Sequence, residues 1–224
     1  MARPKDVVCD HPKILFVGIN PGVTSGKVGH HFAGTYNPFF ELLHAARLVP
    51  VVLKAEDDQR LAEFGHALVN LCARPTQLAS ELSSTELAAG RVALLLKIRA
   101  MRPAVVALVG VTLYPIVCGR GGPPGPGPKD DVLEGARVFV VPNPSGLNAS
   151  FPTFADKAPW FVRLAEFAAN PPPLPDTPVT RTLIKPRASL AGRSGQGVTG
   201  SPMTKKSRSG QGVTGSPVTK KSKS

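Results

Sequence analysis

Short, continuously apolar segments alternate with longer segments of helical spacing through the first 170 residues of the chain. The short segments predict buried β-strands at Lys13–Val17, Val105–Val109 and Val138–Val141. The longer segments, whose apolar residues recur every three or four positions, predict helices over Pro38–Leu48, Asp57–Leu68, Ser84–Met101, Leu113–Cys118 and Ala158–Ala169. One stretch rich in Gly and Pro predicts an irregular loop at Gly119–Lys129.

This alternation indicates the fold class. Apolar strands separated by helices are typical of a parallel sheet that is covered on both faces, so we expect an α/β fold with three α/β/α layers and a central, mainly parallel sheet. Ligands bind such sheets at the carboxyl ends of the strands. Two of the predicted strands lead into unusual loops, one from Gly18 and one from Pro142. We therefore expect these loops to form the functional site.

Composition limits the class of protein. Of 224 residues, 42% are hydrophobic, which is enough for a normal core, and no apolar run is long enough to predict a membrane span. No apolar segment follows the basic N-terminal residues, so we expect no secretory signal. Three widely spaced cysteines, Cys9, Cys72 and Cys118, favour an intracellular protein without a disulfide framework. Because no Cys or His spacing resembles a zinc or iron–sulfur site, we expect no metal and no cofactor.

Most of the positive charge lies in one terminal segment. Residues 171–224 hold ten Lys and Arg against one Asp, so this segment carries +9 of the net charge of +12. It contains a 15-residue repeat, RSGQGVTGSPMTKKS at Arg193–Ser207 and RSGQGVTGSPVTKKS at Arg208–Ser222, with too few large apolar residues to form a core. We therefore expect an N-terminal extension (1–12), one folded domain (13–170) and a disordered basic tail (171–224).

The basic tail predicts a polyanionic partner, and nucleic acid is the natural candidate. The alternative is a tail that is basic only for solubility or for nuclear import. A third possibility is an adaptor that binds RNA through the repeats, in which case the tail alone should account for the binding.

The loop after the first predicted strand reads GINPGVTSGKVG. A phosphate-binding loop of the Walker A type needs Gly where this chain has Pro21 and Ser or Thr where it has Val28, so that class is disfavoured. A nucleotide-binding protein of the Rossmann type needs GxGxxG after the first strand, and this pattern is missing. Taken alone, Gly18–Gly22 has the composition of an ordinary turn.

The second loop, VPNPSGLNASFP at Val141–Pro152, carries an apolar side chain, Leu147, at the tip of a rigid polar turn. Proteins that distort duplex DNA insert such side chains between base steps, so Leu147 is a candidate DNA wedge. The alternative is a leucine that covers an edge of the core.

Four stretches together carry a specific resemblance: GINPG at Gly18–Gly22, HHFAGTYNPFFELL at His30–Leu43, LVNLCARPT at Leu68–Thr76, and the second loop. In this order they resemble the thymine-DNA glycosylase and mismatch-specific uracil-DNA glycosylase family, from Lys13 to Phe167. The resemblance implies a uracil-DNA glycosylase-like fold, and an enzyme that extrudes a base from the duplex and hydrolyses its bond to the sugar. The tail lies outside the resemblance.

The resemblance also implies roles for individual residues. Asn20 matches the catalytic asparagine that orients the attacking water, and a side-chain amide suits that role because it can hold water without acting as a strong base. The residues implied to surround the flipped base are Ile19, Phe32, Asn70 and Ser145, and those implied to contact DNA are Gly146, Leu147, Asn148 and Lys27. The alternative for Phe32 is an ordinary phenylalanine of the core, and the alternative for Lys27 is a charge that is simply solvated.

The expected function is a DNA repair glycosylase that needs no cofactor. We expect it to release uracil, and thymine or other modified pyrimidines, from G·U and G·T mismatches in double-stranded DNA. Neither loop contains a lysine that must form a Schiff base, so we expect no strand cleavage. The alternative is a non-catalytic mismatch-binding module of the same fold. We expect a monomer without a membrane partner, in the nucleus of a eukaryote or otherwise in the cytoplasm with the nucleoid.

One departure from the family pattern concerns the opposite strand. The bacterial members that are specific for mismatched uracil follow NPSGL with Ser-Arg, whereas this chain has Asn148-Ala149. The missing arginine weakens the expected reading of the opposite guanine.

Overall fold

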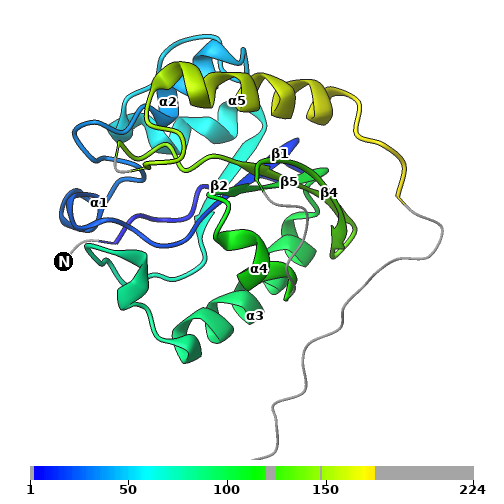
Figure 1. Ribbon diagram of the computed structural model, residues 1–224. Coiled ribbons are helices and arrows are strands. Elements are labelled where there is room, and N and C mark those ends of the chain that lie inside the picture. Colours follow the sequence, from blue (N-terminus) through cyan, green and yellow to red (C-terminus); the bar gives the residue numbers. More distant parts are fainter. Residues whose placement is uncertain (1–2, 120–124, 147, 175–224) are drawn as a thin grey trace, which may run out of the picture. The chain divides into compact units, whose positions relative to one another are not determined.

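The computed structural model describes residues 3–119, 125–146 and 148–174 (Figure 1). Five strands form one sheet in the order β2-β1-β3-β5-β4. In chain order, the strands are β1 (Ile14–Gly18), β2 (His66–Asn70), β3 (Val105–Val109), β4 (Gly127–Leu133) and β5 (Ala136–Val141). β1, β2, β3 and β5 pair in parallel, and β4 is antiparallel to β5. The predicted central, mainly parallel sheet is therefore confirmed.

Helices cover both faces of this sheet. The α-helices are α1 (Val23–Val28), α2 (Phe39–Ala45), α3 (Ser84–Met101), α4 (Leu113–Cys118) and α5 (Phe154–Ala169), and the 3-10 helices are η1 (Ala55–Phe64) and η2 (Ala79–Glu81). Figure 1 shows α2 and α5 on one face and α3 and α4 on the other. This arrangement confirms the expected three α/β/α layers.

The alternating sides of β1 show how the sheet joins the two layers. Ile14 and Phe16 pack into the hydrophobic cluster beneath α2 and α5, whereas Leu15 and Val17 pack into the cluster beneath α3 and α4. All four side chains are completely buried. Successive strand residues point to opposite faces, so a strand buried on both sides must be apolar at every position, as the sequence pattern indicated.

The longest helix, α3, begins with a reciprocal cap. The backbone N–H of Glu86 donates to Ser83 Oγ at 3.1 Å, and the backbone N–H of Ser83 donates to a Glu86 carboxylate oxygen at 2.9 Å. This capping box satisfies two amide groups that have no partner within the helix. The helix ends at Met101, before Arg102 with φ of +52° and Pro103, so its predicted bounds are confirmed.

The predicted helix over Asp57–Leu68 is wrong. The chain forms η1 up to Phe64, turns at Gly65 with φ of +76°, and then enters β2. Residues 66–70 are a strand because they pair in register with β1, an interaction that no local pattern reveals.

Several other boundaries differ from the predictions: α2 ends at Ala45 rather than Leu48, and β5 begins at Ala136 rather than Val138. Two more differences have an identifiable cause. β4 begins at Gly127, inside the predicted loop Gly119–Lys129, because this segment pairs with β5. The sequence pattern did not reveal the strand, since several of its residues are charged. α5 begins at Phe154 rather than Ala158, since the Thr153 hydroxyl accepts a hydrogen bond from Asp156 N–H at 3.2 Å and caps the helix one turn earlier.

Two predictions concern residues that the structure does not describe. The tail was predicted from residue 171, and its residues 175–224 lie outside the described ranges. Leu147, the candidate wedge, also lies outside them. Among the helices in the described part of the chain, none is both long enough and apolar enough to cross a membrane.

Gly90 provides a test of how α3 packs against the sheet. A Cβ at this position would lie 2.4 Å from the Leu71 carbonyl oxygen and 3.2 Å from Cys72 Sγ. Alanine normally stabilises a helix relative to glycine by about 1 kcal/mol. Here we expect Gly90→Ala to lower the free energy of unfolding by about 1–3 kcal/mol, because the backbone must shift. Chemical denaturation measures the difference.

The exposed Ala89 on the same helix supplies the control for Gly90→Ala. Ala89→Gly should lower the free energy of unfolding by about 1 kcal/mol, which is the difference in intrinsic helix propensity between alanine and glycine. A Gly90→Ala protein that is more stable than wild type would contradict the packing described here.

Candidate active site

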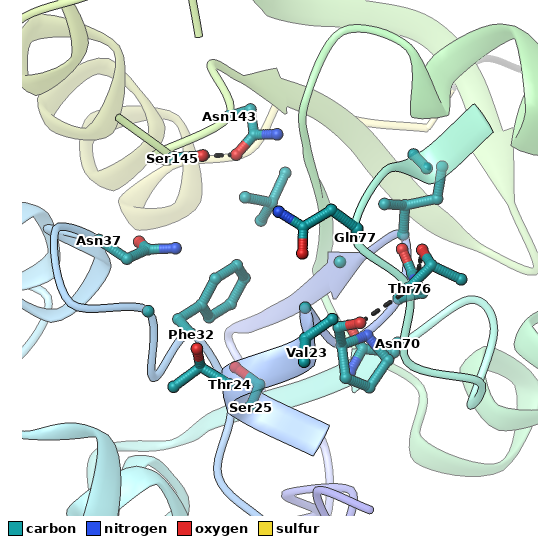
Figure 2. A pocket seen from close by; sticks show the side chains of 18 residues that line it. Val23, Thr24, Ser25, Phe32, Asn37, Asn70, Thr76, Gln77, Asn143 and Ser145 are labelled. Carbon is teal, nitrogen blue, oxygen red and sulfur yellow. Dashed lines mark hydrogen bonds between the residues drawn. The ribbon is translucent and has the colours of Figure 1, made fainter. Parts of the chain in front are cut away.

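A pocket of about 300 Å³ opens at the carboxyl ends of the parallel strands. Gly18 ends β1, Asn70 ends β2 and Val109 ends β3, and each of them lines the pocket. Figure 2 shows side chains from several elements around this space, among them Phe32, Asn37, Gln77 and Asn143. The site therefore lies where the strand topology predicted it.

Backbone hydrogen bonds join the loop after β1 to the segment after β2. The N–H groups of Leu71 and Cys72 donate to the carbonyls of Gly18 and Ile19, both at 2.8 Å. Further along, the N–H of Thr76 donates to the carbonyl of Pro21 at 3.2 Å. These bonds extend the parallel pairing of β1 and β2 beyond the sheet and fix the backbone on both sides of Asn20.

The side-chain amide of Asn20 is held by its nitrogen. Asn20 Nδ2 donates to Thr76 Oγ1 at 2.7 Å and to the Arg74 carbonyl at 2.9 Å, and the Pro21 carbonyl lies 3.1 Å away. The Thr76 hydroxyl donates its own hydrogen to the Leu78 carbonyl at 2.8 Å, so its oxygen accepts from Asn20. Asn20 Oδ1 has no hydrogen bond to any described residue and can accept one from a ligand.

An ion pair supports the carbonyl that holds Asn20. Arg74 Nε donates to one oxygen of Glu86 at 2.6 Å, and Arg74 Nη2 donates to the other at 3.0 Å. Hydrogen bonds from Arg74, and then from Ser83, lower the pKa of Glu86 to about 2. Because Glu86 is also part of the cap of α3, the pair ties the loop beside Asn20 to the start of this helix.

Phe32 lines the pocket from a strained backbone conformation. Its φ is +52°, which is unusual for a bulky residue and costs about 1–3 kcal/mol. The neighbouring backbone is fixed on both sides, since His31 N–H donates to Asp58 Oδ2 at 2.8 Å and Ala33 N–H donates to Ser25 Oγ at 3.0 Å. The Phe32 ring stacks on Phe39 with 4.0 Å between centroids. It is half-buried, so it both packs on the core and lines the pocket.

Asn70 lies beside Phe32 because residue 18 has no side chain. A Cβ on Gly18 would lie 2.5 Å from Asn70 Oδ1 and 3.6 Å from Phe32 Cζ. Any larger residue at position 18 would displace the Asn70 amide. On its other side, the Asn70 Nδ2 group lies 3.2 Å from His31 Nδ1.

The second loop forms the opposite wall of the pocket. Ser145 lines the pocket next to Asn143 (Figure 2). Its backbone N–H donates to Asn143 Oδ1 at 3.0 Å. Asn148 braces this turn, because its Nδ2 donates to the Asn143 carbonyl at 2.9 Å and its N–H donates to the Ser145 carbonyl at 3.1 Å. Gly146 is exposed and, with Tyr36, lines an adjoining hollow of about 430 Å³.

The pocket gathers one group of the residues that the sequence singled out: Ile19, Asn20, Phe32, Asn70 and Ser145. Their individual roles stay predictions. Gly146 and Asn148 each line a separate hollow next to the pocket. Lys27 is exposed on α1 and lines neither the pocket nor these two hollows. The wedge role of Leu147 stays a prediction outside the described residues.

Sequence reasoning missed several lining and supporting residues: His31, Asn37, Thr76, Gln77 and Asn143. Most of them fall in the stretches that carried the family resemblance, so their place in those stretches was the sequence feature that could have identified them. Within the part of the chain that the structure describes, no group of three or more His, Cys, Asp or Glu side chains is placed to hold a metal ion.

Two comparisons relate this chain to known proteins. Residues 5–166 match the family model described as the uracil DNA glycosylase superfamily. A solution structure from Methanosarcina acetivorans, described as a candidate uracil DNA glycosylase, resembles this chain with a TM-score of 0.49 and 16% sequence identity. The match covers 74% of this chain and 98% of that one.

The Arg74–Glu86 pair generates a pH-dependent prediction. The pKa of Glu86 is lowered from 4.5 to about 2, so its ionised form favours the folded state above pH 4.5, and this contribution is lost as the pH falls through about 2. We expect Glu86→Gln to be less stable than wild type at neutral pH, and the difference to shrink near pH 2. Chemical denaturation at both pH values measures it.

The matched control is Glu63→Gln, which removes an exposed pair with Arg60 at 3.4 Å. Such a pair contributes little, so this variant should follow wild type at both pH values. A stability difference between Glu86→Gln and wild type that is constant from neutral pH to pH 2 would contradict the assigned role of the Glu86 charge.

Proposed function

The chain belongs to the uracil DNA glycosylase superfamily, and we propose that it is a DNA repair glycosylase acting on uracil in G·U mismatches of double-stranded DNA. Thymine and other modified pyrimidines opposite guanine are further proposed substrates. The observation that carries the proposal is the Asn20 amide, whose nitrogen is held by Thr76 and Arg74 and whose oxygen is left for a ligand at the pocket.

In the proposed reaction, Asn20 positions water rather than deprotonating it. Its Oδ1 accepts a hydrogen bond from a water molecule, whose oxygen attacks C1′ of the flipped nucleotide. The C1′–N1 bond breaks, its electron pair leaves with the base, and the sugar keeps the hydroxyl. The water proton is released to solvent, and the base anion is later protonated.

The chemistry of the pocket fits a good leaving group. Among its lining residues there is no Asp or Glu, so a strong general base is missing from the described wall. Uracil leaves as a stabilised anion, and such a bond needs positioning more than proton abstraction. We therefore infer a slow, monofunctional enzyme whose substrates are already labile, without a lysine-linked intermediate and without strand cleavage.

Two side chains of the pocket fit a flipped pyrimidine. The half-buried Phe32 ring offers a flat surface, and stacking of a base on an aromatic ring is worth about 1–3 kcal/mol. Asn70, next to it, offers hydrogen bonds to the edge of the base. Stacking selects a planar ring and hydrogen bonds select its pattern of donors and acceptors, so together they would favour a pyrimidine.

The preference for mismatches rests on the cost of extrusion. A mispaired nucleotide leaves the duplex more easily than a paired one, so G·U and G·T sites are the proposed targets. We also propose that the protein acts as a monomer on nuclear DNA in a eukaryote or on the nucleoid otherwise.

Asn20→Ala tests the proposed chemistry. Without the amide oxygen, water loses its orientation, so we expect single-turnover excision of uracil from a G·U duplex to fall by about 10²-fold or more. Binding to the same duplex should change by less than about threefold, since Asn20 contacts water rather than the base stack. Alkali cleavage of the abasic product measures the rate.

Asn170→Ala is the matched control, because Asn170 is an exposed asparagine at the end of α5, away from the pocket. It should keep the wild-type rate. Equal excision by Asn20→Ala and wild type would contradict the role of Asn20, and a wild-type protein that binds G·U duplexes without excising uracil would instead support a non-catalytic mismatch-binding module.

Removal of residues 171–224 tests the proposed role of the basic tail. The truncation removes +9 of the net charge, so duplex binding at about 50 mM salt should weaken by about tenfold or more, and much less at 200 mM. The single-turnover rate at saturating enzyme should stay near wild type. A large fall in that rate would contradict the assignment of the tail to DNA backbone contacts.

A further inference from the structure

His31 is a buried histidine behind the pocket, and both of its ring nitrogens have partners. The side chain is 2% exposed. Its Nε2 lies 3.0 Å from the Lys5 carbonyl, and its Nδ1 lies 3.2 Å from Asn70 Nδ2. The backbone N–H of His31 donates to Asp58 Oδ2, so the ring is anchored from the main chain as well.

These partners determine where the ring carries its hydrogen. A carbonyl oxygen only accepts hydrogen bonds, so Nε2 must donate to Lys5. In a neutral imidazole the other nitrogen then has a free electron pair, and Nδ1 accepts a hydrogen bond from Asn70 Nδ2. The neutral ring therefore fixes which end of the Asn70 amide faces it.

The orientation of Asn70 decides what the pocket offers to a base. With its nitrogen turned to His31, its Oδ1 lies against Gly18, 2.5 Å from where a Cβ would be, and both residues line the pocket. The same point is 3.6 Å from the Phe32 ring, on which the base is proposed to stack. The pocket thus presents a hydrogen-bond acceptor beside the stacking surface.

We propose that His31 is a positioning residue that sets the specificity of the pocket through Asn70: the neutral ring selects pyrimidines with a hydrogen on N3, and the protonated ring selects those with a lone pair there. Uracil and thymine belong to the first class and cytosine-type bases to the second. The inference rests on the proposed function and names the feature of the substrate that this site reads.

The two states follow from the donors and acceptors of the ring. Protonated imidazole donates from both nitrogens, so the Asn70 nitrogen can no longer face Nδ1. Rotation of the terminal amide by half a turn brings Oδ1 to His31 and the NH₂ group to the pocket. A donor then replaces an acceptor at the same place, without any movement of the backbone.

The groups around His31 keep its ring neutral at physiological pH. Burial lowers the pKa of His31 below 6.5, and the positive charge of a protonated His30 acts in the same direction. The Lys5 carbonyl, Asp58 and Asp6 act to raise it, but burial is the largest effect. The neutral state is therefore the ordinary one, and the switch to the protonated state occurs on acidification.

Nuclear magnetic resonance of the wild-type protein tests the starting state directly. The ¹⁵N shifts of the His31 ring report which nitrogen carries hydrogen. At pH 8 we expect a protonated Nε2 and an unprotonated Nδ1. A ring protonated on Nδ1 at that pH would overturn the proposal, because Asn70 could not then donate to it.

Binding of two matched duplexes tests the selectivity. They carry 2′-fluoroarabino-uridine or 2′-fluoroarabino-cytidine opposite guanine, analogues whose sugar bond resists hydrolysis. Each affinity is expressed relative to that for a normal duplex of the same sequence. At pH 8, wild type should bind the uridine duplex about tenfold more tightly than the cytidine duplex on this scale. At a pH low enough for the ¹⁵N shifts to show a His31 ring protonated on both nitrogens, the preference should fall severalfold. In His31→Phe and Asn70→Ala this fall should be absent or much smaller, and the preference that remains reflects the easier extrusion of mispaired uridine.

The outcomes separate this proposal from the function on which it rests. A wild-type preference that does not change as the His31 ring becomes protonated, or an equal change in His31→Phe, would overturn the role of His31 while uracil excision persists. Protonation of the cytosine ring itself would act equally in wild type and in His31→Phe, so the variant excludes it. A protein that neither excises uracil nor binds either analogue above normal duplex would overturn both proposals. Should His31→Phe fail to fold, the ring shifts of wild type still decide.

Discussion

The pairing of the two loops that follow β1 and β2 is the constraint on which the rest of the site depends. Three backbone hydrogen bonds join the two loops past the edge of the sheet, from Gly18 to Pro21 on one side and from Leu71 to Thr76 on the other, although the strand register is not kept as far as Thr76. A loop held in this way cannot rearrange without breaking bonds continuous with the core. Its side chains are therefore positioned before any ligand binds, which is the condition for catalysis by positioning.

Asn20 and Asn70, the two asparagines discussed above, are oriented in the same way. Each turns its amide nitrogen toward fixed acceptors, Thr76 and Arg74 for Asn20, and His31 for Asn70. Each then leaves an amide oxygen that no described residue engages. The pocket is consequently a set of oriented acceptors beside an aromatic ring, without carboxylates among its described lining residues. Such a site can hold water and read a base, but it must rely on a bond that breaks easily.

The sequence predicted the parts of the fold that have local causes. β1, β3 and α3 were recognisable because a buried strand must be apolar throughout and α3 carries its own cap and stop. β2 was mistaken for the end of a helix, because only pairing with β1 makes it a strand.

The same division applies to the site. The resemblance to known proteins identified Asn20, Phe32 and Asn70, and the structure brings all three to one pocket. The hydrogen bond from Asn70 to His31 joins positions 39 residues apart, and no local pattern in the sequence reveals it. The strained φ of Phe32 depends in the same way on contacts of its neighbours with distant residues.

The most direct test is a crystal structure of the protein bound to a G·U duplex with a non-hydrolysable uridine analogue. We expect to find the uracil on the Phe32 ring and a water molecule between Asn20 Oδ1 and C1′. An Asn20 amide turned away from C1′, with the base still stacked in the duplex, would contradict it.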